Sequence, residues 1–163
     1  MRKAPPHVIE IFLNPGEYYF GDRDTRIRTI LGSCVSITVW HPKLQIGGMC
    51  HYMLPSRHEK AMKTGDGKYA DEAFGLLLEE IRRSGTDLAE YQVKMFGGGN
   101  MFVRHTAAGN GHIGLKNADA GRHLVKHHGL NLLSEHLGGA GHRTVIFDIW
   151  SGHVWVRQLA LQG

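Results

Sequence analysis

Stretches in which apolar and polar residues alternate dominate this chain, and they predict β-strands. In the clearest stretch, which runs from Val35 to Trp40, every second residue is apolar and β-branched. That two-residue period is typical of a strand with one buried face. Further strands are expected over residues 8–13, 17–20, 27–31, 46–54, 91–96, 130–137, 143–150 and 153–161.

Two longer windows have the helical period instead. Residues 69–83 place Ala73, Leu77 and Ile81 on one face, and Gly85 follows where a helix C-terminus is commonly capped. The second window, 113–128, repeats the pattern at Ile113, Asn117, Ala120 and Leu124 and stops at Gly129. Nine strands and two helices that do not alternate favour an α+β fold.

The chain is long enough for one domain with a sizeable core, and we expect a single domain over residues 1–163. No internal repeat or linker interrupts it. Residues 56–68 are polar and contain glycine, which predicts an exposed loop.

Composition and charge exclude several classes of protein. The chain is 42% hydrophobic and 21% charged, which argues against wholesale disorder. The net charge of +4 is spread along the sequence, whereas nucleic-acid binding favours clustered basic residues. No apolar stretch is long enough for a signal peptide or a spanning helix. We therefore expect a cytoplasmic protein with reduced thiols, and no disulfide between Cys34 and Cys50.

The glycine run Gly97–Gly99 does not have the features of a nucleotide site. It lacks the Lys-Ser/Thr pair that follows a phosphate-binding loop, and no GxGxxG opens a helix. The run is better explained by close backbone packing, or by a turn, beside a site.

Twelve histidines raise the question of a metal site. His123 and His127 have i, i+4 spacing on the second predicted helix, but no glutamate lies between them as in HExxH. Cys50 and His51 are adjacent on a strand and so point to opposite faces. Cys34 and Cys50 together supply two ligands, fewer than a closed zinc site needs. No metal is expected.

Cys34 and His51 are a more informative pair. The predicted hairpin of strands 35–40 and 46–54 brings them into one neighbourhood, and Gly32 and Ser33 allow a bend before the cysteine. A neighbouring imidazole can lower the pKa of a thiol and serve as its base. On spacing alone, a small buried hydrophobic cysteine is the commoner case, and Thr29 is explained as an ordinary strand residue.

A family resemblance changes that balance. The segments TILGSCVSITVWHP, IGGMCHYMLP, YADEAFGLLLEEI, KMFGGGNMF, IGLKNADAGRHLV, LGGAGHRTVIFD and SGHVWVR resemble, in order, the chemoreceptor glutamine deamidases of the CheD family. The resemblance extends from about residue 8 to residue 160. It implies a β-rich α+β sandwich with sheets packed between helices, similar to that of glutamine-deamidating toxins. It also implies hydrolysis of receptor glutamines to glutamate with release of ammonia.

The resemblance further implies roles for individual residues. The nucleophile falls on Cys34, the general acid and base on His51, and the orienting residue on Thr29. Ser33 and Gly32, next to the nucleophile, are expected to contact the substrate, with the Ser33–Cys34 backbone as a candidate oxyanion donor. No cofactor is implied.

The same resemblance bears on partners and on alternatives. Methyl-accepting chemotaxis receptors are the implied protein substrate, and a CheC-type phosphatase is a further partner. The loop 56–68 and the segment Phe96–Met101 are candidate contact surfaces. Cys50 stands where a small apolar residue is expected, which favours a packing role. Two alternatives stay open: a regulatory binding module with vestigial catalysis, and a cysteine protease or transglutaminase.

Overall fold

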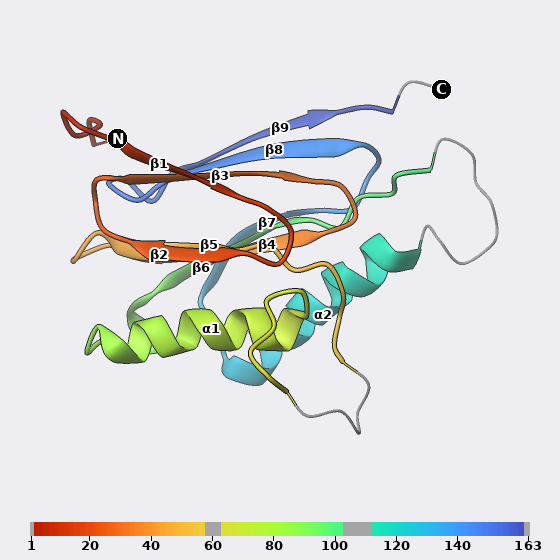
Figure 1. Ribbon diagram of the computed structural model, residues 1–163, viewed down its shortest axis with the longest axis horizontal. Coiled ribbons are helices and arrows are strands. Elements are labelled where there is room, and N and C mark those ends of the chain that lie inside the picture. Colours follow the sequence, from red (N-terminus) through yellow and green to blue (C-terminus); the bar gives the residue numbers. More distant parts are fainter. Residues whose placement is uncertain (1, 58–62, 103–111, 162–163) are drawn as a thin grey trace.

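The computed structural model describes residues 2–57, 63–102 and 112–161. The described residues form nine strands, two α-helices and one short 3-10 helix, Leu88–Glu90 (Figure 1). The strands are β1 (Ile9–Leu13), β2 (Tyr18–Gly21), β3 (Thr25–Leu31), β4 (Val35–His41), β5 (Ile46–Cys50), β6 (Gln92–Gly97), β7 (Leu132–Leu137), β8 (His142–Asp148) and β9 (Val154–Leu159). The helices are α1 (Ala70–Arg83) and α2 (His112–His128).

The strands form two stacked sheets. One has four strands in the order β1-β3-β8-β9, and the other has five in the order β2-β5-β4-β6-β7. Both α-helices contact the five-stranded sheet, α1 at β2 and β5 and α2 at β4 and β6. The layers are therefore helices, five-stranded sheet and four-stranded sheet (Figure 1). The expected β-rich layered α+β fold is confirmed. Among the described residues the sheets are not packed between helices, however, because both helices lie on the outer face of the five-stranded sheet and the four-stranded sheet forms the opposite outer layer.

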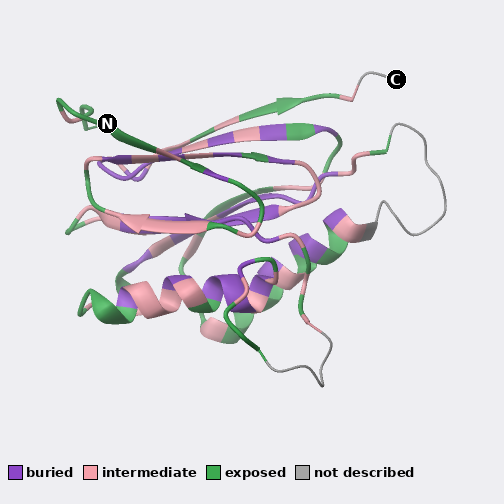
Figure 2. Cartoon of the chain, in the orientation of Figure 1, coloured by how far each residue is buried: buried purple, intermediate pink, exposed green. Residues whose placement is uncertain are grey.

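Two hydrophobic clusters fill the spaces between these layers (Figure 2). The inter-sheet cluster includes Ile27 and Leu31 from β3 and Phe147 from β8, all fully buried. The helix-facing cluster includes Val35 and Ile37 from β4 and Phe74 from α1. Trp40 of the same strand packs against the inter-sheet cluster. The central β4 therefore contributes to both clusters, because alternate residues of a strand face opposite sides.

Most predicted elements have their observed boundaries within two residues. The exception is the predicted strand 46–54, because β5 ends at Cys50. A single bridge then joins Val35 to Tyr52. The N–H of Leu54, which a continued strand would direct at β4, donates to the Lys68 carbonyl instead, as does the N–H of Met53. This segment leaves β4 because another part of the chain competes for its hydrogen bonds.

The loop predicted over residues 56–68 is described except at 58–62. Its second half is held against the start of α1 by the buried carboxylate of Glu72. That group accepts backbone N–H bonds from Thr64, Gly65 and Asp66 at 2.9, 3.1 and 3.2 Å. It also pairs with Arg57 at 3.1 Å, so this part of the loop is anchored to the helix.

Candidate active site

Thr29 and His51 meet in the layer between the two sheets. Thr29 lies on β3 of the four-stranded sheet, and His51 follows β5 of the other sheet. The hydroxyl of Thr29 lies 2.7 Å from Nδ1 of His51 and donates to the Leu13 carbonyl at 2.8 Å. Both side chains are buried. The contact that the resemblance implied between these two residues is therefore present.

This arrangement determines the histidine tautomer. A threonine hydroxyl has one hydrogen, and that hydrogen is used on Leu13. The oxygen must therefore accept from His51, which puts the ring proton on Nδ1 and leaves the lone pair on Nε2. Nε2 is buried and has no hydrogen-bond partner among the described residues. Burial lowers the pKa of His51 to about 4, so the ring is neutral at pH 7 and able to accept a proton.

Cys34 lies on the same sheet face as His51. The Val35–Tyr52 bridge places Cys34 and His51 one residue to the N-terminal side of each bridge partner. Both side chains therefore point away from the helices, because neighbouring residues along a strand alternate. In agreement, Cys34 packs against the inter-sheet cluster. At this diagonal position across two strands, Cα atoms are typically about 7–8 Å apart, within reach of side chains.

The thiol of Cys34 is free and half-buried. Burial raises its pKa above the ordinary value, opposite to the lowering expected from a neighbouring imidazole. The imidazole does not offset the desolvation because it is itself neutral in the same apolar layer. The resting pair is therefore a thiol and a neutral base, not an ion pair.

The glycine run Gly97–Gly99 holds the backbone around Cys34. Gly98 donates its N–H to the Cys34 carbonyl at 2.8 Å, and Gly99 donates to the Gly32 carbonyl at 2.9 Å. A Cβ on Gly97, whose φ is +113°, would lie 2.2 Å from the Cys34 carbonyl oxygen. The close backbone packing that the sequence predicted for this run is confirmed. The N–H groups of Ser33 and Cys34 donate to none of the described residues.

Ser36 is a polar neighbour of this pair that sequence reasoning did not single out. The paired residues on either side, Val35–Tyr52 and Thr38–Met49, place Ser36 directly opposite His51. Its hydroxyl is buried without a partner among the described residues. Nothing in the alternating pattern distinguishes this serine from an ordinary polar strand residue.

Asn117 on α2 is a second residue that the sequence did not assign. Its side-chain amide contacts the strand segments that carry Cys34 and His51, through the carbonyls of Ser33 and Met53. The sequence does indicate that this residue is unusual, since Asn117 is a polar residue in an otherwise apolar face of the predicted helix.

The remaining predicted positions divide into buried and accessible groups. Cys50 is fully buried in the helix-facing cluster, on the opposite face from His51, which confirms a packing position. Gly32 and Ser33 are partly exposed, next to Cys34. Phe96 belongs to the inter-sheet cluster, so this end of the candidate contact segment Phe96–Met101 is core and not surface.

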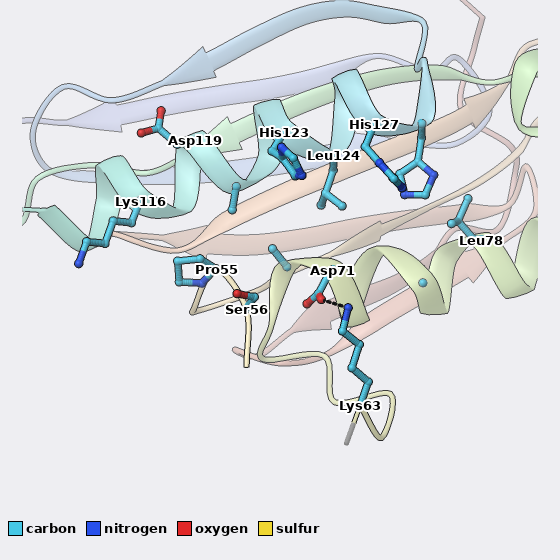
Figure 3. Close-up of a pocket in the computed structure, with 14 residues that line it drawn as sticks. Pro55, Ser56, Lys63, Asp71, Leu78, Lys116, Asp119, His123, Leu124 and His127 are labelled. Atoms are coloured by element: carbon cyan, nitrogen blue, oxygen red, sulfur yellow. Dashed lines mark ion pairs between the residues drawn. The ribbon is translucent and has the colours of Figure 1, made fainter. Parts of the chain in front are cut away.

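A cavity of about 930 Å³ lies between α1 and α2, on the helix side of the five-stranded sheet. Neither Cys34 nor His51 lines it, whereas His123 and His127 do (Figure 3). The two imidazole rings stack with centroids 6.1 Å apart. Within residues 2–57, 63–102 and 112–161, no three or more His, Cys, Asp or Glu side chains gather as metal ligands. Among the helices described, none has the length and apolar character to span a membrane.

Comparison with known proteins gives consistent matches. The family model described as "CheD chemotactic sensory transduction" matches residues 53–158. The chain is 49% identical, over 96% of its length and 91% of the relative's, to "Probable chemoreceptor glutamine deamidase CheD 3" of Dechloromonas aromatica (strain RCB). A "Probable chemoreceptor glutamine deamidase CheD 1" of Leptospira interrogans serogroup Icterohaemorrhagiae serovar copenhageni (strain Fiocruz L1-130) is 40% identical over 94% of this chain and 95% of its own.

Proposed function

Because the chain belongs to the CheD family, we propose that it hydrolyses glutamine side chains of chemotaxis receptors to glutamate and releases ammonia. The observation that carries the proposal is the Thr29–His51 hydrogen bond of 2.7 Å. It leaves Nε2 as a neutral base on the sheet face that also carries Cys34. A buried base without a partner, beside a thiol, is an arrangement suited to nucleophilic catalysis.

The first half of the reaction forms a thioester. Nε2 of His51 takes the thiol proton as Cys34 Sγ attacks the carboxamide carbon of the substrate. The N–H groups of Ser33 and Cys34 donate to the developing oxyanion. The imidazolium then returns the proton to the leaving nitrogen, and ammonia departs.

The second half regenerates the enzyme. Water, deprotonated by Nε2 of His51, attacks the thioester, and the carbon–sulfur bond breaks. The thiolate regains its proton, and the receptor leaves with a glutamate side chain in place of the glutamine. Throughout, Thr29 holds the Nδ1–H and so keeps the ring in one orientation, the role of the third residue in other triads. The residues in these steps require no metal or organic cofactor.

The test is mass spectrometry of a receptor cytoplasmic fragment after incubation with the wild-type protein or Cys34→Ala. We expect glutamine-to-glutamate conversion, a mass gain of about 1 Da at each site, that disappears in the variant because the nucleophile is missing. Cys50→Ala is the matched control and should retain conversion, because Cys50 is buried on the other face.

Conversion that persists in Cys34→Ala would refute the assigned nucleophile. Receptor binding without any conversion would instead favour the regulatory binding module. Peptide cleavage or amine incorporation would indicate a protease or a transglutaminase. The proposal places the reaction in the cytoplasm, and a pull-down with a CheC-type phosphatase tests that second partner.

A further inference from the structure

The side chain of Asn117 bridges two strands that lose their own pairing at this point. Asn117 is fully buried on α2. Its single amide nitrogen donates one hydrogen to the Ser33 carbonyl at 3.0 Å and the other to the Met53 carbonyl at 2.8 Å. Its own main-chain carbonyl accepts a 2.6 Å bond from the Tyr52 hydroxyl.

The two carbonyls belong to residues within two positions of the proposed catalytic pair. Ser33 precedes Cys34, and Met53 lies two residues after His51. The last pair of backbone hydrogen bonds between the two strands joins Val35 and Tyr52. The N–H of Val35 donates to the Tyr52 carbonyl at 3.1 Å, and the N–H of Tyr52 donates to the Val35 carbonyl at 2.9 Å. Beyond it the strands separate, because the N–H of Leu54 donates to Lys68 and not to Ser33.

We propose that Asn117 is a positioning residue. Its amide replaces the backbone hydrogen bond that the two strands lack beyond Val35 and Tyr52, and so fixes the separation of Cys34 and His51. The helix thereby sets the catalytic geometry from the far side of the sheet, through the backbone, without contacting substrate. This inference rests on the proposed function only where kcat is measured, because the rate of Cys34 alkylation does not require deamidation.

The chemistry of the amide supports this role. Bridging two carbonyls from one atom needs a nitrogen with two hydrogens, which asparagine has and aspartate, serine and leucine lack. The Oδ1 of Asn117 is buried with no partner among the described residues. A buried acceptor left without a partner typically lowers the stability of a protein. An apolar residue at this helical position would avoid that loss, which indicates that the two donors are the useful part of the amide.

The test compares Asn117→Asp and Asn117→Ala with two controls. Asn117→Asp keeps the shape but removes both donors, and Asn117→Ala avoids the new charge should the first variant not fold. Leu124→Ala is the stability control, because Leu124 is a buried residue of the same helix away from the two carbonyls. Asn131→Asp makes the same chemical change at an exposed position.

Two readouts are measured well below each variant's melting temperature. In either Asn117 variant kcat should fall about 100-fold, as misplacement by about 1 Å can produce, with KM nearly unchanged. The rate of Cys34 alkylation by iodoacetamide should rise about 30-fold, because two hydrogen bonds that together contribute about 2 kcal/mol no longer oppose local opening.

The outcomes separate this inference from the proposed function. A wild-type protein that deamidates nothing overturns the function, while the alkylation comparison still tests the role of Asn117. The inference itself is overturned if the Asn117 variants match Leu124→Ala in both readouts, or if their loss falls on KM with kcat unchanged.

Discussion

At the scale of single residues, the hydroxyl of Thr29 decides what His51 can do. By donating to Leu13 it must accept from Nδ1, and the ring is then free to take a proton at Nε2. Without that hydroxyl, the ring could adopt the other tautomer, with Nε2 protonated and unable to serve as the base. The threonine therefore contributes through hydrogen-bond direction and not through charge.

Thr29→Val should separate this role from packing, because valine has nearly the same shape and no hydroxyl. We expect kcat to fall about 100-fold as the ring loses its fixed orientation, with the fold retained. Thr29→Ser, which keeps the oxygen, should stay within several-fold of the wild type. Steady-state deamidation kinetics measure both, and equal losses in the two variants would count against the tautomer argument.

The ionisation of the pair predicts an unusual pH dependence. His51 with a pKa of about 4 stays neutral, so kcat/KM should hold as pH falls through 6.5 and decline only near pH 4. Because burial raises the pKa of Cys34, alkylation of its thiol should keep rising through pH 9. An alkylation rate that is already constant between pH 5 and 7 would instead indicate a preformed ion pair.

At the scale of elements, the turn after β6 holds the backbone of Cys34, the proposed nucleophile. Gly97→Ala should reduce both stability and activity, because its Cβ would overlap the Cys34 carbonyl. Gly129→Ala is the matched control: Gly129 also has a positive φ, +61°, but a Cβ there meets no atom within 4 Å. Thermal melts and deamidation assays should show the larger loss at Gly97, and equal losses would mean that backbone strain alone matters.

Hydrophobic periodicity predicted these elements well, since it reports which face of each strand or helix is buried. It failed after Cys50, where Met53 and Leu54 still look like strand residues but bond to Lys68. Competition between distant segments for backbone partners has no signature in a local pattern.

The site was predicted less completely. The resemblance assigned roles to Thr29, Cys34 and His51, and these roles stay predictions, although the structure does bring Thr29 and His51 into contact. The contributions of Leu13, through its carbonyl, and of Ser36, through strand register, depend on tertiary pairing. The sequence did not predict that the pKa of Cys34 is raised, since the shift depends on how far burial between the sheets removes the thiol from water.

At the scale of the whole molecule, a neutral buried histidine links acid stability to the site. In the unfolded chain His51 takes up a proton near pH 6.5, whereas in the folded chain it does so near pH 4. The unfolded state therefore binds more protons between these values. The contribution of His51 to the free energy of unfolding therefore falls by about 3 kcal/mol as pH drops from 7 to 4. Denaturant titrations of the wild type and His51→Gln measure this, and an identical pH dependence in both would contradict it.

The two sheets also divide the proposed catalytic residues between them. Cys34 and His51 adjoin β4 and β5 of the five-stranded sheet, while Thr29, which contacts the imidazole, lies on β3 of the four-stranded sheet. A chain in which only the five-stranded sheet has formed would carry the thiol and the imidazole without the hydroxyl that fixes the ring. We expect such a partly folded chain to be inactive toward glutamine, and activity to appear only when both sheets have formed.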